Sequence, residues 1–129
     1  MSEKISQLQT DGSFGSTYNI SRTASMFLSP EKIEYSKVKT YLDHRNSYES
    51  EWCSVLDGIE LAIEKNEYVL ELENDNKAVI ESLMRKKRPA KPYVVDYFDQ
   101  ILDISKKIDY LAVRWIPREL NKADKLFRI

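Results

Sequence analysis

The segment Tyr68–Ile80, YVLELENDNKAVI, changes its pattern part-way along and thereby decides how the chain folds. Its first part, YVLELE, combines a short apolar run with acidic side chains at alternate positions, which is typical of a β-strand. The second part continues into NKAVIESLMRKK, a helical pattern that Pro89 ends. Asp75 lies at the joint, between two asparagines. It either caps the helix, since aspartate accepts hydrogen bonds from free helical N–H groups, or binds a metal ion together with other carboxylates.

The bulk composition suits one globular domain and excludes several kinds of site. The 129 residues are 42% hydrophobic and 32% charged, so we expect a single domain over residues 1–129 with one core beneath a charged surface. Cys53 and His44 are the only cysteine and histidine, which excludes an internal disulfide, a zinc site with several cysteines, and any catalytic or metal site that needs two histidines. No apolar run approaches the roughly 20 residues that cross a bilayer, and no signal peptide is recognisable. We therefore expect a cytoplasmic protein that does not contact membranes.

Hydrophobic periodicity predicts the remaining elements. β-branched and aromatic residues mark three stretches of the first third, which predicts an antiparallel three-stranded meander. Apolar residues then recur at three- and four-residue steps from Ser47 to Lys65, the pattern of an amphipathic helix. The expected order is three strands, a helix, a strand, two helices and a strand, over residues 4–14, 17–29, 32–42, 47–65, 68–73, 76–87, 90–107 and 109–117. This order predicts an α/β fold with a mixed five-stranded sheet flanked by helices.

Acidic residues stand at the ends of the predicted strands. Asp11 is expected where the first strand stops, Asp75 follows the fourth strand, and Asp124 follows the fifth after a short loop. The carboxyl ends of neighbouring parallel strands meet at one edge of an open α/β sheet, so these carboxylates are expected to lie together. Converging carboxylates repel one another, which is costly unless a divalent cation offsets the repulsion. The arrangement therefore points to a metal site.

A fourth acid is expected from the helix over 47–65, where Glu49 and Glu51 compete. Helical phase does not choose between them, because each lies roughly 80° from the centre of the apolar face, on opposite sides. Either glutamate also has an ordinary explanation as an acid near the start of a helix, where the helix dipole favours negative charge.

Four sequence motifs, in this order, resemble those of the type 1 ribonuclease H family: QTDGSFG (9–15), SYESEWCSVLDGIELA (47–62), LELENDNKAVI (70–80) and WIPRELNKADKL (115–126). The resemblance covers essentially the whole chain and includes the order of the predicted elements. It implies an RNase H-like fold. Alignment of Ile59–Ala62 with an apolar-Glu-Leu-Ala run of the family selects Glu51 and leaves Glu49 a solvated neighbour. The resemblance further implies two Mg²⁺ ions, replaceable by Mn²⁺, held by four catalytic acids: Asp11, Glu51, Asp75 and Asp124.

The resemblance also implies an enzyme that hydrolyses the RNA strand of RNA/DNA hybrids, recognised through 2′-hydroxyl groups across the shallow minor groove. The expected substrate contacts are Gly12, Ser13, Asn46, Ser47, Asn76 and Arg118. Two other interpretations stay open: a catalytically inactive RNase H-like module for nucleic-acid binding or assembly, and a nuclease of the same fold that acts on structured DNA. The sequence identifies no protein partner.

Two segments depart from the family pattern or leave a choice open. The segment Asn121–Ile129, which carries the last aspartate, stands where the family has a closing helix, and it is too short to hold a helix without packing. Its only expected anchors are Leu126, Phe127 and Ile129. The basic run Arg85–Arg88 is either a solvated helix end or a contact with a phosphate backbone.

Overall fold

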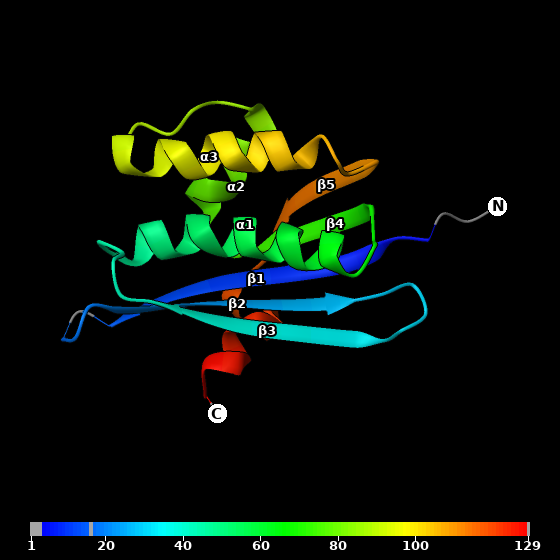
Figure 1. The fold of residues 1–129 in the computed structure, drawn as a ribbon, viewed down its shortest axis with the longest axis horizontal. Coiled ribbons are helices and arrows are strands. Elements are labelled where there is room, and N and C mark those ends of the chain that lie inside the picture. Colours follow the sequence, from blue (N-terminus) through cyan, green and yellow to red (C-terminus); the bar gives the residue numbers. More distant parts are fainter. Residues whose placement is uncertain (1–3, 16, 129) are drawn as a thin grey trace.

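The computed structural model describes residues 4–15 and 17–128, and it confirms the predicted order of strands and helices (Figure 1). These elements are β1 (Ser6–Gly15), β2 (Ile20–Leu28), β3 (Glu34–Tyr41), α1 (Ser47–Glu64), β4 (Val69–Asn74), α2 (Lys77–Arg85), α3 (Pro92–Ser105) and β5 (Tyr110–Trp115). Two 3₁₀ helices follow, η1 (Arg118–Leu120) and η2 (Lys122–Arg128). Within the described part of the chain, every helix is too short or too polar to cross a bilayer.

The five strands form one mixed sheet in the order β3-β2-β1-β4-β5. Strands β1, β2 and β3 are antiparallel neighbours, as expected for a meander. Strand β4 runs parallel to β1, and β5 runs parallel to β4. Strands β1 and β4 run in the same direction and pair as far as Gln9 and Glu73. The residues just after these two positions therefore lie at the same edge of the sheet.

Asp11 is expected where the first strand stops, but β1 continues past it to Gly15, so Asp11 does not lie at its end. The pairing of β1 with β4 stops at Gln9 opposite Glu73, but the pairing with β2 continues past Asp11, opposite Ala24, as far as Gly15. The Asp-Gly-Ser triplet is typical of a turn, yet pairing with β2 keeps it extended. Asp11 thus lies where β1 parts from β4, and this position places it beside the end of β4.

The three α-helices cover one face of the sheet, as Figure 1 shows. Helix α1 lies against β1 and β2, and α3 packs on α1. The apolar stripe of α1 carries Trp52, Val55 and Ile59, which are fully buried in the same core cluster as Leu8 and Leu72 of the sheet. Burial of an apolar side chain of this kind contributes about 1.5–3 kcal/mol. This packing fixes the height and rotation of α1 over β1, on which the position of its acidic residues depends.

The C-terminal segment lies on the opposite face of the sheet, where η2 contacts β1 and β2 (Figure 1). The expectation that only apolar side chains anchor it is wrong. Asn121 and Ala123 are buried, whereas Leu126 and Phe127 are half-buried. Ile129, the third expected anchor, lies outside the described residues. Hydrogen bonds to β1 therefore hold the segment together with its apolar contacts.

Candidate active site

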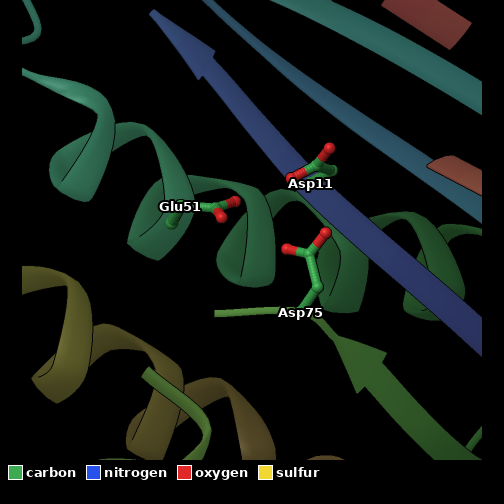
Figure 2. A group of neighbouring side chains, drawn as sticks. All are labelled: Asp11, Glu51 and Asp75. Atoms are coloured by element: carbon green, nitrogen blue, oxygen red, sulfur yellow. The ribbon is translucent and has the colours of Figure 1, made fainter. Parts of the chain in front are cut away.

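Three carboxylates from separate parts of the chain meet at one edge of the sheet. Asp11 comes from β1, Glu51 from α1, and Asp75 from the residue that follows β4 (Figure 2). Each offers a carboxylate oxygen, and these atoms lie within 4.8 Å of one another. The interpretation of Asp75 as the cap of α2 is wrong. The N-cap is Asn76, whose side chain accepts a hydrogen bond from the N–H of Val79 at 3.1 Å.

Asp124 joins this group from η2, on a segment that follows the fifth strand. It lines the same pocket as the other three acids. The guanidinium of Arg118 lies 3.6 Å from Asp124 Oδ1 and so places a positive charge at the rim. The structure thus brings together all four acids that the sequence singled out. The pocket is lined by Asp11, Gly12, Ser13, Phe14, Glu51, Asp75, Arg118 and Asp124.

Gly12 allows strand β1 to touch the first turn of α1. A Cβ atom on Gly12 would lie 2.5 Å from the carbonyl carbon of Ser50 and 2.6 Å from the backbone nitrogen of Glu51, which no side chain tolerates. In this contact the N–H of Gly12 donates to Glu51 Oε1 at 2.6 Å and to Asp11 Oδ1 at 3.0 Å. The hydroxyl of Ser50 donates to the carbonyl of Ser13 at 3.2 Å and ties the same turn to β1. One backbone N–H thus aligns two of the carboxylates.

The electrostatic state of the cluster follows from burial and mutual repulsion. Burial raises the pKa of Asp11, and the charge of Asp75 raises it further. Burial, followed by the charge of Asp11, raises the pKa of Glu51. Burial also raises the pKa of Asp75, while the nearby guanidinium of Arg118 lowers it in part. Full ionisation of these carboxylates costs free energy on its own, and a divalent cation among them offsets that cost.

Comparison with known proteins identifies the family of the chain. A family model described as reverse transcriptase-like matches residues 9–127, which is nearly the whole chain. The chain belongs to the reverse transcriptase-like family. A comparison with the sequences of curated proteins gave no match.

Solved RNase H structures share the fold of this reverse transcriptase-like protein. RNase H1 from the halophilic archaeon Halobacterium salinarum NRC-1 has a TM-score of 0.86 over 95% of this chain and 93% of that chain, at 16% identity. The N-terminal RNase H domain of Rv2228c from Mycobacterium tuberculosis has a TM-score of 0.79 over 96% of this chain and 91% of that chain, at 15% identity. LC11-RNase H1 has a TM-score of 0.79 over 96% of this chain and 93% of that chain, at 17% identity. It was isolated from compost by a metagenomic approach, and its structure was solved in complex with an RNA/DNA hybrid. These likenesses confirm the RNase H-like fold that the four motifs implied.

Glu49 is buried in this reverse transcriptase-like protein, so its expected role as a solvated neighbour is wrong. Its Oε1 accepts a hydrogen bond from the backbone N–H of Arg45 at 2.8 Å, and its Oε2 accepts one from the hydroxyl of Tyr97 at 2.8 Å. Two helix positions separate it from Glu51, which turns the two side chains about 200° apart around the axis. Helix α3 therefore covers Glu49, and Glu51 is the glutamate beside Asp11.

Four of the residues expected to contact substrate lie at the surface or at the pocket. Gly12, Ser13 and Arg118 line the pocket beside the acids. Ser47 is exposed at the first position of α1. Their role as substrate contacts stays a prediction.

The two expected asparagines have structural partners instead. Asn46 is the N-cap of α1, where its side chain accepts from the N–H of Glu49 at 3.0 Å and donates to the hydroxyl of Tyr93 at 2.8 Å. Asn76 caps α2, and neither asparagine is among the residues that line the pocket. Free N–H groups at a helix start need such acceptors, which explains why asparagine stands at both positions.

Two buried polar side chains near the acids carried no signal in the sequence. Asn74 and Asn121 are 0% and 1% exposed, and both amides donate to the backbone carbonyl of Thr10. Asparagine is mostly an exposed residue, so composition gives no reason to expect it in the interior. Their short distance along the chain from Asp75 and Asp124 is the one clue that the sequence offers.

Proposed function

We propose that the protein is a metal-dependent ribonuclease H, which hydrolyses the RNA strand of RNA/DNA hybrids. The observation that carries the proposal is the meeting of Asp11, Glu51 and Asp75 within 4.8 Å, in a pocket that Asp124 also lines. The family and the fold support it. LC11-RNase H1, which has the same fold, was solved in complex with an RNA/DNA hybrid.

The donor set fits a hard divalent cation. All four candidate ligands are carboxylates, the ligands that suit Mg²⁺ and Mn²⁺, and no cysteine or histidine is among the described residues that line the pocket. Burial, together with mutual repulsion, raises the pKa of three of these acids, and bound cations offset such repulsion. When bound, two Mg²⁺ ions, or Mn²⁺ in their place, supply the Lewis acidity for phosphodiester hydrolysis. We assign their ligands as Asp11, Glu51, Asp75 and Asp124.

Residues around the acids would hold these ligands and the substrate in place. The N–H of Gly12 fixes a Glu51 oxygen and an Asp11 oxygen on the same donor, which sets the spacing of the two carboxylates. Arg118 lies at the rim beside Asp124 and would hold a substrate phosphate by a charge-assisted hydrogen bond.

Recognition of the hybrid would rest on contacts with the RNA backbone. Gly12 and Ser13 at the pocket, and the exposed hydroxyl of Ser47, are the proposed partners of 2′-hydroxyl groups. Asn46 and Asn76 would support these contacts by capping α1 and α2, which orients the helix starts.

The test is Mg²⁺-dependent cleavage of three labelled substrates: an RNA/DNA hybrid, double-stranded RNA and branched DNA. We expect cleavage of the RNA strand of the hybrid, loss of cleavage on addition of a chelator, and recovery with Mn²⁺. Binding of the hybrid without cleavage would instead identify an inactive binding or assembly module. Cleavage of branched DNA in place of the hybrid would identify a nuclease for structured DNA.

The basic run Arg85–Arg88 lies at the end of α2, beside the start of α1. Arg85, Lys87 and Arg88 line a shallow groove there. Arg88 already pairs with Asp99, at 3.0 Å, so much of its charge is offset within the protein. Arg85 and Lys87 are therefore the better candidates for a contact with a phosphate backbone.

The double substitution Arg85→Gln/Lys87→Gln is expected to raise the KM for the hybrid. It should also reduce the slope of log affinity against log salt by about one unit per lost phosphate contact. Arg88→Gln is the matched control and should change the slope less, because Asp99 already neutralises it. Affinity measured over a series of salt concentrations tests this. An unchanged slope in the double variant would identify the run as a solvated helix end.

Glu49→Gln is expected to lower the free energy of unfolding by about 1–3 kcal/mol, because the amide keeps only one of the two acceptor oxygens in a buried position. Cleavage per folded molecule should stay at the parent level. Urea unfolding and activity on the same samples test both parts, with Glu64→Gln on the exposed side of α1 as control. Loss of turnover at unchanged stability would show that Glu49, and not Glu51, belongs to the site.

A further inference from the structure

Buried polar groups meet where β1, β4 and the C-terminal segment come together. Thr10 and Asn74 are 0% exposed and Asn121 is 1% exposed. Each of the three lies close along the chain to a proposed metal ligand, since Thr10 precedes Asp11, Asn74 precedes Asp75, and Asn121 stands three residues before the last aspartate. The segments that carry three of the four acids thus share one buried junction.

One backbone carbonyl joins the three segments. The carbonyl of Thr10 accepts from Asn121 Nδ2 at 2.8 Å and from Asn74 Nδ2 at 3.0 Å. Asn74 Nδ2 also lies 2.9 Å from the hydroxyl of Thr10. The side-chain oxygen of Asn121 accepts from the N–H of Ala123 at 3.1 Å, and that of Asn74 accepts from the N–H of Asn76 at 2.7 Å. Each amide therefore bonds at both ends, which fixes its orientation.

The C-terminal segment depends on this junction for its position. Helix η2 is a short 3₁₀ helix, and its apolar residues Leu126 and Phe127 are only half-buried. Short 3₁₀ helices have poor hydrogen-bond geometry and do not hold a fixed position without outside contacts. Gln9 adds a second link, because its Oε1 accepts from the N–H of Lys122 at 2.8 Å. Asn121 is the more deeply buried of the two links, and removal of a buried bond costs more than removal of an exposed one.

We propose that Asn121 is a positioning residue, which fixes the start of η2 to the carbonyl of Thr10 and thereby places Asp124 beside Asp11 as a metal ligand. The inference rests on the proposed function, because it takes Asp124 to bind metal. It adds that a buried amide on the C-terminal segment, bonded to strand β1, is the main link that holds the last ligand in place.

The first test measures binding of Mn²⁺ alone, followed through the electron paramagnetic resonance signal of the free ion. Asn121→Ala should weaken Mn²⁺ binding about tenfold, the lower end of the effect seen when a group that orients a metal ligand is removed. In an Asp124→Asn background the same substitution should cause a smaller further loss, because Asn121 acts mainly through Asp124 and only in part through its hydrogen bond to Asp75. Asn74→Ala serves as the matched control. Asn74→Ala removes the other amide that donates to the carbonyl of Thr10. Because Asn74 precedes Asp75 and not Asp124, this variant should weaken Mn²⁺ binding in both the parent and the Asp124→Asn background. An equal loss from Asn121→Ala in both backgrounds would overturn the inference.

The second test needs no metal. Hydrogen exchange by mass spectrometry should show faster exchange in residues 118–128 of Asn121→Ala and unchanged exchange in α1. Unchanged exchange in residues 118–128 would overturn the inference, since Asp124 would then be held by something else. Cleavage of the RNA/DNA hybrid separates the inference from the proposed function. If Asn121→Ala gives the expected Mn²⁺ and exchange results but the parent protein cleaves no hybrid, the positioning role is supported and the ribonuclease H proposal is contradicted.

Discussion

Asp11→Asn, Glu51→Gln and Asp75→Asn are each expected to reduce the rate of hybrid cleavage at least about 100-fold. Each carboxylate is one of few ligands in the proposed two-ion site, and even a group that only orients a metal ligand typically changes affinity or activity by about 10–100-fold. The three losses should be similar in size, because such residues act as a unit. Single-turnover cleavage at saturating Mg²⁺ measures them, with Glu60→Gln on the exposed side of α1 as control. Parent-level cleavage by any of the three variants would contradict the assignment.

The same variants should be at least as stable as the parent when no metal is bound. Burial and mutual repulsion raise the pKa of all three acids, so ionisation at neutral pH favours the unfolded chain. This loss of stability is absent below the unfolded-state pKa of about 4, grows as the pH rises from there to the raised folded-state pKa, and is complete above it. Asparagine or glutamine in place of the acid removes this loss of stability, because an amide does not ionise. Added Mg²⁺ should reverse the order, because binding stabilises the parent. Urea unfolding with a chelator and with Mg²⁺ measures both effects.

Gly12→Ala is expected to lower the free energy of unfolding by about 3 kcal/mol and to abolish most activity. The new Cβ would lie 2.5 Å from the carbonyl carbon of Ser50 and 2.6 Å from its oxygen, and backbone atoms cannot move aside without shifting α1 away from β1. Overpacking of this kind typically costs about 1–3 kcal/mol, occasionally more. The shift also breaks the bond from the N–H of Gly12 to Glu51. Urea unfolding, together with cleavage at temperatures where the variant is folded, measures the two losses.

The other two glycines of the chain supply matched controls. A Cβ on Gly15 would meet only the carbonyl oxygen of Ile20, at 3.8 Å, an ordinary contact, so Gly15→Ala should be nearly neutral. A Cβ on Gly58 would lie 2.4 Å from Thr10 Cγ2, a side-chain atom, so Gly58→Ala should fall between the two. Equal stability of Gly12→Ala and Gly15→Ala would contradict the close approach of β1 to α1.

The order of elements, the mixed sheet and the convergence of the acids can all be predicted from the amino-acid sequence. Periodicity is a local property, so it separates the strand Val69–Asn74 from the helix Lys77–Arg85 without knowledge of the rest of the chain. Parallel strands then bring Asp11 and Asp75 to one edge whatever side chains surround them.

The partners of the buried polar side chains, in contrast, follow from the packing of distant parts of the chain. The positions of Glu49 and Glu51 around the helix axis do not distinguish them. Glu49 is buried because helix α3 covers it, and the hydroxyl of Tyr97, 48 residues further along the chain, donates a hydrogen bond to it. The link from Asn121 to Thr10 spans 111 residues, so no local pattern reports it. The physical reason is that hydrogen bonds across such distances form only after the sheet and helices have packed, when burial gives an otherwise ordinary polar residue a specific partner.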